Sequence, residues 1–202
     1  MKAGVLFSGG KDSSLAAVLL SRDYTVELNT FVFSPERSLL AVERAARAIG
    51  LPWFRRTFGE GLLDRAVEMV LASGYPNGAI QMVHREALRS LAAEYRVIAD
   101  GTRFDDRIPM LSRDEVQSLQ DTTGCSYLRP LLGFPRREVD RLVARHLQIA
   151  HGETGRIENG DYEAEIREGV RARGKDAAGF FPAGHAQSLV TGIIDDMRVR
   201  YT

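Results

Sequence analysis

The chain has 202 residues, and its 27 Lys and Arg side chains are balanced by 27 Asp and Glu side chains, so its formal net charge at pH 7 is zero. The length fits one domain, and the 44% apolar share is that of a globular protein without a membrane-spanning segment. One cysteine, Cys125, excludes an internal disulfide and a zinc or iron–sulfur site built from several cysteines.

Strand-like and helix-like segments alternate along the first 150 residues, which predicts a parallel sheet covered by crossover helices. The expected strands are 4–7, 25–33, 52–58, 96–99 and 127–131. The expected helices are 13–21, 39–49, 62–71, 82–93, 113–119 and 136–146. We therefore expect an α/β fold in which a five-stranded parallel sheet is sandwiched between helices.

The last part of the chain has a different pattern. After the turn signal Asn159-Gly160, the residues Tyr162, Ile166 and Val170 recur at helical spacing, and an apolar but irregular stretch follows. We expect a domain over residues 1–150 and a C-terminal extension over 151–202. Because about 50 residues bury little surface on their own, we expect this extension to be a lid or an oligomer contact, with a homodimer favoured.

A loop rich in glycine and hydroxyl groups follows the first expected strand and opens the first expected helix. Its sequence is Ser8-Gly9-Gly10-Lys11-Asp12-Ser13-Ser14. Glycines allow close approach of a ligand to the backbone, and a helix N-terminus offers unpaired N–H groups, so the loop predicts an anion site. Its spacing matches neither the Walker A loop nor the dinucleotide-binding G-x-G-x-x-G pattern.

The loop resembles the SGGxDS loop of the PP-loop superfamily, the N-type ATP pyrophosphatases, which are adenine nucleotide alpha hydrolase-like proteins with a Rossmann-like (HUP) fold. The match covers Ser8, Gly9, Gly10, Asp12 and Ser13. Two later segments, 100–106 and 129–139, are similar to superfamily segments at a strand end and before a late helix. The resemblance extends to about residue 146, and is nearest to a small archaeal-type branch that has been linked to tRNA 2-thiouridine synthesis.

The resemblance implies that ATP is cleaved to AMP and pyrophosphate and that AMP is joined to a substrate oxygen. The groups expected to bind pyrophosphate are Ser8, Gly9, Gly10, Ser13 and Ser14, and the residues expected to take part in catalysis are Asp12, Lys11 and Ser13. Asp12 is the first expected Mg²⁺ ligand, with Asp105 or Asp106 second, because hard cations prefer carboxylate oxygen.

The remaining parts of the nucleotide are assigned to later segments. We expect adenine beside Phe31, Val32 and Phe33 at the end of the second strand, and the α-phosphate beside Gly101 and Thr102. Arginines that could hold phosphate or an RNA backbone are Arg129, Arg136 and Arg137, although a solvated surface position is an equal alternative for each.

The chain departs from the superfamily where several members carry a PCxxC motif, because it has Tyr75-Pro76-Asn77-Gly78-Ala79 there. Sulfur or ammonia would therefore have to come from another protein. Cys125 is either a single acceptor thiol or a small buried residue, and His185 either closes over the nucleotide or is structural. The other histidines, His84, His146 and His151, are scattered and predict no common site.

The function expected from these patterns is that of a cytoplasmic, ATP- and Mg²⁺-dependent adenylating enzyme that acts on tRNA in a thiolation-type modification. Two alternatives stay open. One is a small-molecule ligase or amidotransferase-like synthetase. The other is a nucleotide-binding regulatory module that holds ATP without turnover.

Overall fold

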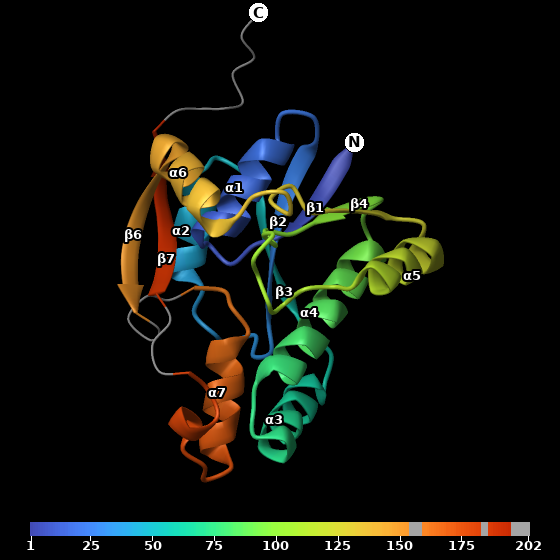
Figure 1. Cartoon of the computed structure of the whole chain (residues 1–202), viewed down its shortest axis with the longest axis vertical. Helices are drawn as coiled ribbons and strands as arrows, with labels where there is room; N and C mark the ends of the chain where they lie inside the picture. Colours follow the sequence, from blue (N-terminus) through green and yellow to red (C-terminus); the bar gives the residue numbers. More distant parts are fainter. Residues whose placement is uncertain (154–158, 183–185, 195–202) are drawn as a thin grey trace, which may run out of the picture.

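The computed structural model describes residues 1–153, 159–182 and 186–194. Its centre is a five-stranded parallel sheet with the order β3-β2-β1-β4-β5 (Figure 1). The strands are β1 (Lys2–Leu6), β2 (Thr25–Val32), β3 (Trp53–Thr57), β4 (Val97–Ala99) and β5 (Ser126–Leu128). The expected α/β fold with a five-stranded parallel sheet is confirmed.

Helices cover both faces of this sheet (Figure 1). One face carries α1 (Lys11–Leu20), α2 (Leu40–Ala48) and α6 (Arg136–His146). The other carries α3 (Leu62–Ser73), α4 (Asn77–Ala92), α5 (Arg113–Thr123) and α7 (Glu163–Ala172). Among the described residues, none of these helices combines the length and apolar character needed to cross a membrane.

Several predicted boundaries differ from the structure; for example, α5 continues to Thr123, four residues past its predicted end. Two of the differences have local reasons. Helix α4 begins at Asn77, five residues before the predicted start. Asn77 and Gly78 lie in its first turn, and Pro76 is its N-cap residue. Strand β5 ends at Leu128, since the chain after it turns away in a short loop in which Leu132 donates its amide to the carbonyl oxygen of Arg129.

The core consists of two apolar clusters, one on each face of the sheet. Leu15, Val18 and Leu28 belong to the cluster beneath α1, α2 and α6. Leu88 and Ile98 belong to the other, beneath α3, α4 and α7. Parallel strands that are buried on both faces read as nearly continuous apolar runs, which is why their positions were predictable.

A second, two-stranded sheet was not anticipated. It pairs β6 (Leu147–Glu153) with β7 (Ala186–Ile193) in antiparallel orientation, and lies beside α2 and α6 (Figure 1). The polar residues Gln187 and Ser188 and the glycine Gly192 interrupt the alternation by which a strand is recognised in the sequence. The domain boundary expected at residues 150/151 falls inside β6.

The C-terminal region shares the core of the rest of the chain. Helix α7 packs on α3, where Gly169 lies so close to Val67 that an added Cβ would come within 2.5 Å of its side chain. Ile166 of α7 is 0% exposed and belongs to the same cluster as α3 and α4. Val190 of β7 belongs to the opposite cluster. The extension is thus packed against the sheet domain of its own chain.

Replacing Ile166 with alanine should reduce the free energy of unfolding of the whole chain by about 2–5 kcal/mol, because a buried side chain is lost and a cavity remains. The matched control is Ile194→Ala, since Ile194 is 57% exposed and its truncation should change stability by about 0.5 kcal/mol or less. Urea unfolding measures both. Equal effects of the two substitutions would contradict the packing of α7 on the sheet domain.

Candidate functional site

A cavity of about 290 Å³ lies at the carboxyl ends of β1 and β4, where the strand order reverses. Ligands of open α/β sheets collect at this point. Its polar wall includes Ser8, Asp12, Ser13, Asn29, His84, Asp100, Gly101, Thr102 and Asp106. Its apolar wall includes Leu6, Phe7, Phe31, Ile80, Ile108 and Pro109. One side is closed by Gly160, Asp161 and Tyr162, which precede α7, and by its first residue, Glu163.

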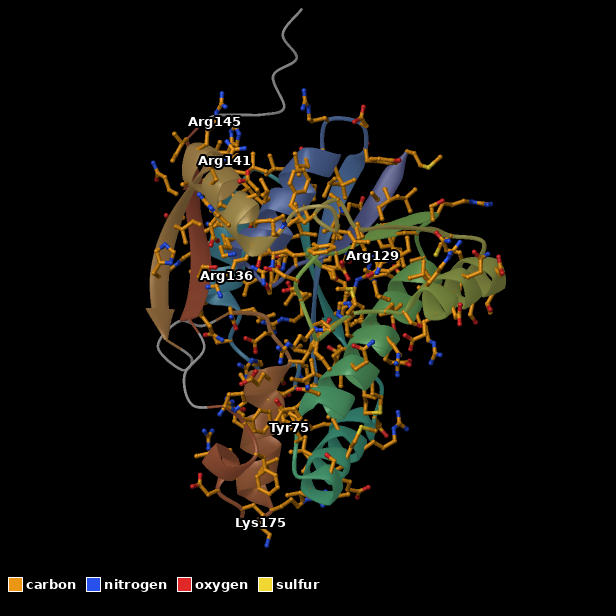
Figure 2. All side chains as sticks on the ribbon, viewed as in Figure 1. Tyr75, Arg129, Arg136, Arg141, Arg145 and Lys175 are labelled. Atoms are coloured by element: carbon orange, nitrogen blue, oxygen red, sulfur yellow. The ribbon has the colours of Figure 1, made fainter. Side chains whose placement is uncertain are left out.

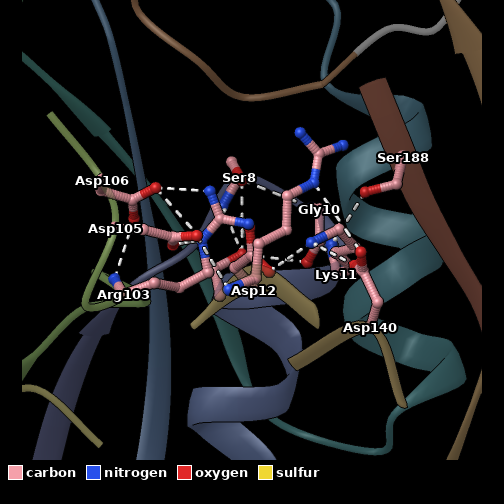
Figure 3. Close-up of polar contacts among 11 residues, drawn as sticks. Ser8, Gly10, Lys11, Asp12, Arg103, Asp105, Asp106, Asp140 and Ser188 are labelled. Carbon is pink, nitrogen blue, oxygen red and sulfur yellow. Dashed lines mark hydrogen bonds and ion pairs between the residues drawn. The ribbon is translucent and has the colours of Figure 1, made fainter. Parts of the chain in front are cut away.

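The loop after β1 is folded around its own hydroxyl groups (Figure 3). The Ser8 amide donates to Ser13 Oγ at 3.3 Å, and the Gly10 amide donates to Ser8 Oγ at 3.3 Å. Gly9 has a φ of +80°, a backbone conformation that residues other than glycine rarely adopt. The hydroxyl oxygens of the two serines thus accept hydrogen bonds from the amides of Ser8 and Gly10, and an anion could accept the same hydrogen bonds in their place.

The C-terminal region holds the same loop from outside. Gly160 donates its amide to the carbonyl oxygen of Ser8 at 2.8 Å, and Val190 donates to that of Gly9 at 2.9 Å. Ser188 Oγ accepts from the first amide of α1 at 3.1 Å. These contacts join segments that are more than 150 residues apart in sequence, so the shape of the loop depends on the extension.

Gly101 connects the loop to the segment after β4. An added Cβ on Gly101 would lie 2.7 Å from the carbonyl carbon of Asp12 and 2.7 Å from the amide nitrogen of Ser13. Only glycine allows this approach of two backbones. The expected neighbours of the α-phosphate, Gly101 and Thr102, are therefore beside the first turn of α1, on the wall of the same cavity.

Arg103 lies between the three carboxylates that were expected to bind a metal (Figure 3). Its guanidinium group is hydrogen-bonded to Asp106, with Nε 3.1 Å from Oδ1, and its Nη1 is 3.7 Å from Oδ2 of Asp12. Nε is 3.8 Å from Oδ1 of Asp105. Burial by itself would lower the pKa of Arg103, but these carboxylates together raise it. The positive charge of Arg103 thus offsets part of the negative charge of these three carboxylates, which a bound metal ion would otherwise offset.

The three carboxylates are not equivalent. Asp12 and Asp106 line the cavity, whereas Asp105 accepts the backbone amide of Arg136 at 3.0 Å, at the start of α6. That amide, together with the charge of Arg103, holds the pKa of Asp105 below its ordinary value. Within the described part of the chain, no group of three or more His, Cys, Asp or Glu side chains is arranged to hold a metal ion.

Lys11 is not among the residues that line the cavity. Its Nζ is 2.7 Å from Oδ1 of Asp12 and 3.0 Å from Oδ1 of Asp140 on α6 (Figure 3). Lys11 and Arg136 instead line a second groove of about 440 Å³ between α6 and the β6–β7 sheet. The other residues of this groove are Asp140, Val143, Ala144, Leu147, Ile149, His151, Gln187 and Ser188.

The end of β2 differs from the wall expected for adenine. Phe31 lines the cavity, but the Val32 side chain is buried in the cluster on the opposite face of the sheet. The amide of Phe33 donates to both carboxylate oxygens of Glu165 at 3.1 Å, and the next amide, that of Ser34, donates to Oε1 at 2.9 Å. Glu165 of α7 therefore occupies the backbone edge that was expected to receive the base.

The structure corrects the expectation that His84 belongs to no common site. His84 Nε2 is 2.8 Å from Oδ2 of Asp100, which also accepts the phenol of Tyr127 at 2.6 Å. Asp100 Oδ1 accepts the Thr102 amide at 3.0 Å. A sequence signal existed, because His84 precedes Leu88 by four residues on the buried face of α4 and Asp100 directly follows an apolar strand. The partnership itself required the fold.

Several other candidates lie away from the cavity. Ser14 is fully buried, and its hydroxyl has no partner among residues 1–153, 159–182 and 186–194. Cys125 is a buried free thiol in the core beside β5. Arg129 donates to the carbonyl oxygen of Leu111 at 3.2 Å. His185 lies outside the described residues.

Substituting Gly101 with alanine should reduce the free energy of unfolding by about 1–3 kcal/mol or more. The new methyl group would push the backbone of residue 101 away from the Asp12–Ser13 peptide. Gly133→Ala is the control, since an added Cβ there meets nothing within 4 Å. Thermal unfolding compares the two. A Gly101 variant as stable as the Gly133 variant would show that the close approach is not a constraint.

A comparison of sequences and a comparison of structures each match this chain to a protein from Methanocaldococcus jannaschii. The uncharacterized protein MJ0690 is 39% identical over 194 residues, 96% of each chain. A crystal structure of a protein described as a predicted subunit of tRNA methyltransferase is 37% identical, with a TM-score of 0.91 over 98% of this chain and 100% of that one. A family model, described as a family of unknown function (DUF7411), matches residues 1–192. The chain therefore belongs to the family of unknown function DUF7411.

Proposed function

We propose that this chain binds ATP in the cavity at the ends of β1 and β4 and transfers AMP to a substrate in RNA modification. The observation that carries the proposal is the close approach of Gly101 to the Asp12–Ser13 peptide. It brings two of the three segments that resemble the PP-loop superfamily, the loop after β1 and the segment after β4, to one cavity. The relative described as a predicted subunit of tRNA methyltransferase supports the RNA side of the proposal.

The residues present fit a triphosphate. A phosphate at the start of α1 would accept from backbone amides that now donate to Ser8 and Ser13, and the helix dipole would stabilise its charge. Gly10 lies against Ser8, since an added Cβ would come within 3.2 Å of Ser8 Oγ, so the absence of a side chain here leaves the loop backbone uncovered. Thr102 and Gly101 offer a second set of small groups on the facing wall.

Asp12 and Asp106 would hold Mg²⁺, because both carboxylates line the cavity. Mg²⁺ usually binds one or two carboxylates and completes its shell with phosphate oxygens and water, so two carboxylates are sufficient. When bound, Mg²⁺ supplies neutralising charge on the phosphate oxygens. Arg103, which now contacts both carboxylates, lies where its guanidinium group can turn to a phosphate oxygen.

The chemistry asked of the protein is mostly positioning. In AMP transfer, a substrate oxygen forms a bond to the α-phosphorus while the bond from that phosphorus to the bridging oxygen of pyrophosphate breaks. The loop after β1 orients the leaving pyrophosphate, and the segment after β4 orients the α-phosphate. The C-terminal region, through Gly160, Ser188 and Val190, keeps the loop in shape.

The outer surface of α6 offers a contact for RNA. Although the chain has no net charge, α6 exposes Arg136, Arg137, Arg141 and Arg145, and Figure 2 shows Arg136, Arg141 and Arg145 along this helix. The acidic side chains among them are Glu138 and Asp140. Helix α6 also begins near the cavity, because its first amide donates to Asp105, the chain neighbour of Asp106 on the cavity wall. Phosphates bound along α6 would place an RNA next to the nucleotide.

The proposal on ATP predicts that Asp12→Asn weakens binding of MgATP by roughly tenfold to a hundredfold, because a charged ligand of the metal is lost. Binding of ATP in the presence of EDTA should change far less. Asp23→Asn, in the exposed turn after α1, is the control. Titration calorimetry gives the affinities, and phosphorus NMR identifies the products.

AMP and pyrophosphate are the products that the proposal predicts. ADP and phosphate would contradict it, as would the absence of MgATP binding. Tight binding with no turnover, in the presence of RNA and of a sulfur- or ammonia-donating partner, would favour the alternative of a regulatory module.

The proposal on RNA predicts that the double substitution Arg141→Glu and Arg145→Glu weakens binding of a labelled tRNA transcript by roughly tenfold or more. It should also reduce the slope of log affinity against log salt by about two, one for each phosphate contact. Arg65→Glu with Arg89→Glu, exposed on α3 and α4, is the matched control. Fluorescence anisotropy measures both pairs. Equal losses in the two pairs would mean that α6 is not the contact surface.

A further inference from the structure

The apolar part of the cavity contains a buried imidazole. His84 lines the same cavity as Phe31, Ile80, Ile108 and Pro109, and its side chain is 6% exposed. Its Nε2 contacts Asp100 at 2.8 Å. Burial of a polar ring costs free energy unless both nitrogens find partners. Among the residues that the structure describes, no hydrogen-bond partner of Nδ1 is found, although Nδ1 is not one of the fully buried unpartnered atoms.

Asp100 decides which nitrogen of His84 carries the proton. Burial by itself would raise the pKa of Asp100, but the contact with His84 and the hydrogen bonds from Tyr127 and Thr102 together hold that pKa below its ordinary value. Because Tyr127 and Thr102 both donate to Asp100, its carboxylate acts as an acceptor and accepts a hydrogen bond from Nε2–H of His84. In the neutral imidazole, this leaves Nδ1 with a lone pair, so Nδ1 can accept a hydrogen bond but cannot donate one.

Tyr162 places a second polar group in the same part of the cavity. Its ring centroid is 6.2 Å from that of His84, and its other ring neighbour is Phe58, at 5.8 Å. Burial, with the nearby charges of Asp100 and Asp161, raises the pKa of Tyr162, so its phenol stays protonated at neutral pH. In the described ranges no hydrogen-bond partner of the Tyr162 hydroxyl is found. The cavity thus offers an acceptor and a donor within an apolar surrounding.

The end of β2 cannot offer the same groups. The amides of Phe33 and Ser34 donate to Glu165, and the carbonyl oxygen of Val32 accepts the amide of Phe58 at 2.9 Å. A planar base at this edge would have to displace a buried carboxylate from two amides. The unpartnered atoms of His84 and Tyr162 require no such displacement.

We propose that the adenine base of the nucleotide lies against Phe31 in the apolar part of the cavity, with its exocyclic amino group donating to His84 Nδ1 and a ring nitrogen accepting from Tyr162. This inference rests on the proposed function, since it names how the same site selects its nucleotide. Hypoxanthine would bring a carbonyl oxygen against the lone pair of Nδ1. His84 is therefore the residue that selects adenine over purines with a carbonyl group at that position.

The probes are ATP, ITP and inorganic pyrophosphate, each titrated with Mg²⁺ into the full chain. The wild type should prefer ATP to ITP by on the order of tenfold or more, because ITP leaves buried polar groups unpaired. His84→Leu should bring the ratio of the two affinities close to one. Tyr162→Phe, which removes one hydroxyl and keeps the ring, should weaken ATP binding by roughly threefold to tenfold. Pyrophosphate affinity should be the same in all three proteins.

If His84→Leu does not fold, Tyr162→Phe and the ATP to ITP ratio of the wild type still test the proposal. A wild type that binds ATP and ITP equally, or variants that keep the preference, would overturn the base assignment and leave the proposed function intact. A His84 variant that keeps the preference but loses ATP cleavage would assign His84 to the chemical step instead. A wild type that binds pyrophosphate but neither nucleotide would overturn the proposed function together with this inference.

Discussion

Gly101 approaches the Asp12–Ser13 peptide so closely that one added carbon would lie 2.7 Å from backbone atoms. This contact fixes the start of α1 relative to the segment that follows β4. Asp100, one residue earlier, is held by Thr102, Tyr127 and His84, so the contact also places the buried polar network on the cavity wall. The geometry of the site therefore depends on the contact between the backbone at Gly101 and the Asp12–Ser13 peptide, where only glycine fits.

The C-terminal region completes the site from the other side. Its amides at Gly160 and Val190 bind carbonyl oxygens of the loop after β1, and Ser188 accepts the first amide of α1. Glu165 binds two amides at the end of β2, and Tyr162 enters the cavity. These residues belong to one chain, so the extension acts as a wall of the cavity within that chain. A contact with a second copy is not needed to build this wall.

Much of the fold could be predicted from the sequence, because buried parallel strands and amphipathic helices have local patterns. The run Thr25–Val32 and the helical spacing of Val42, Ala45 and Ala46 were sufficient to place β2 and α2. The strand β7 could not be predicted in this way. Its partner β6 directly follows the last residue of α6 without a turn, and Gly192 and Ser188 break its alternation.

The candidate site was predictable only where it consists of neighbours in the sequence. Ser8, Gly9 and Gly10 form a recognisable loop, and the structure places Ser8 on the cavity wall. By contrast, the pairing of His84 with Asp100 joins α4 to the end of β4, and the direction of Lys11 depends on Asp140 of α6. Such contacts are set by the packing of helices on the sheet, which no local pattern contains.

A crystal structure with Mg²⁺ and α,β-methylene-ATP, which cannot be cleaved at the reacting bond, tests the central claim most directly. The account predicts that the β- and γ-phosphates bind at Ser8–Ser13 and the α-phosphate beside Gly101 and Thr102, with the base in the cavity. A nucleotide bound in the second groove beside Lys11 and Arg136, or no nucleotide at saturating concentration, would contradict it.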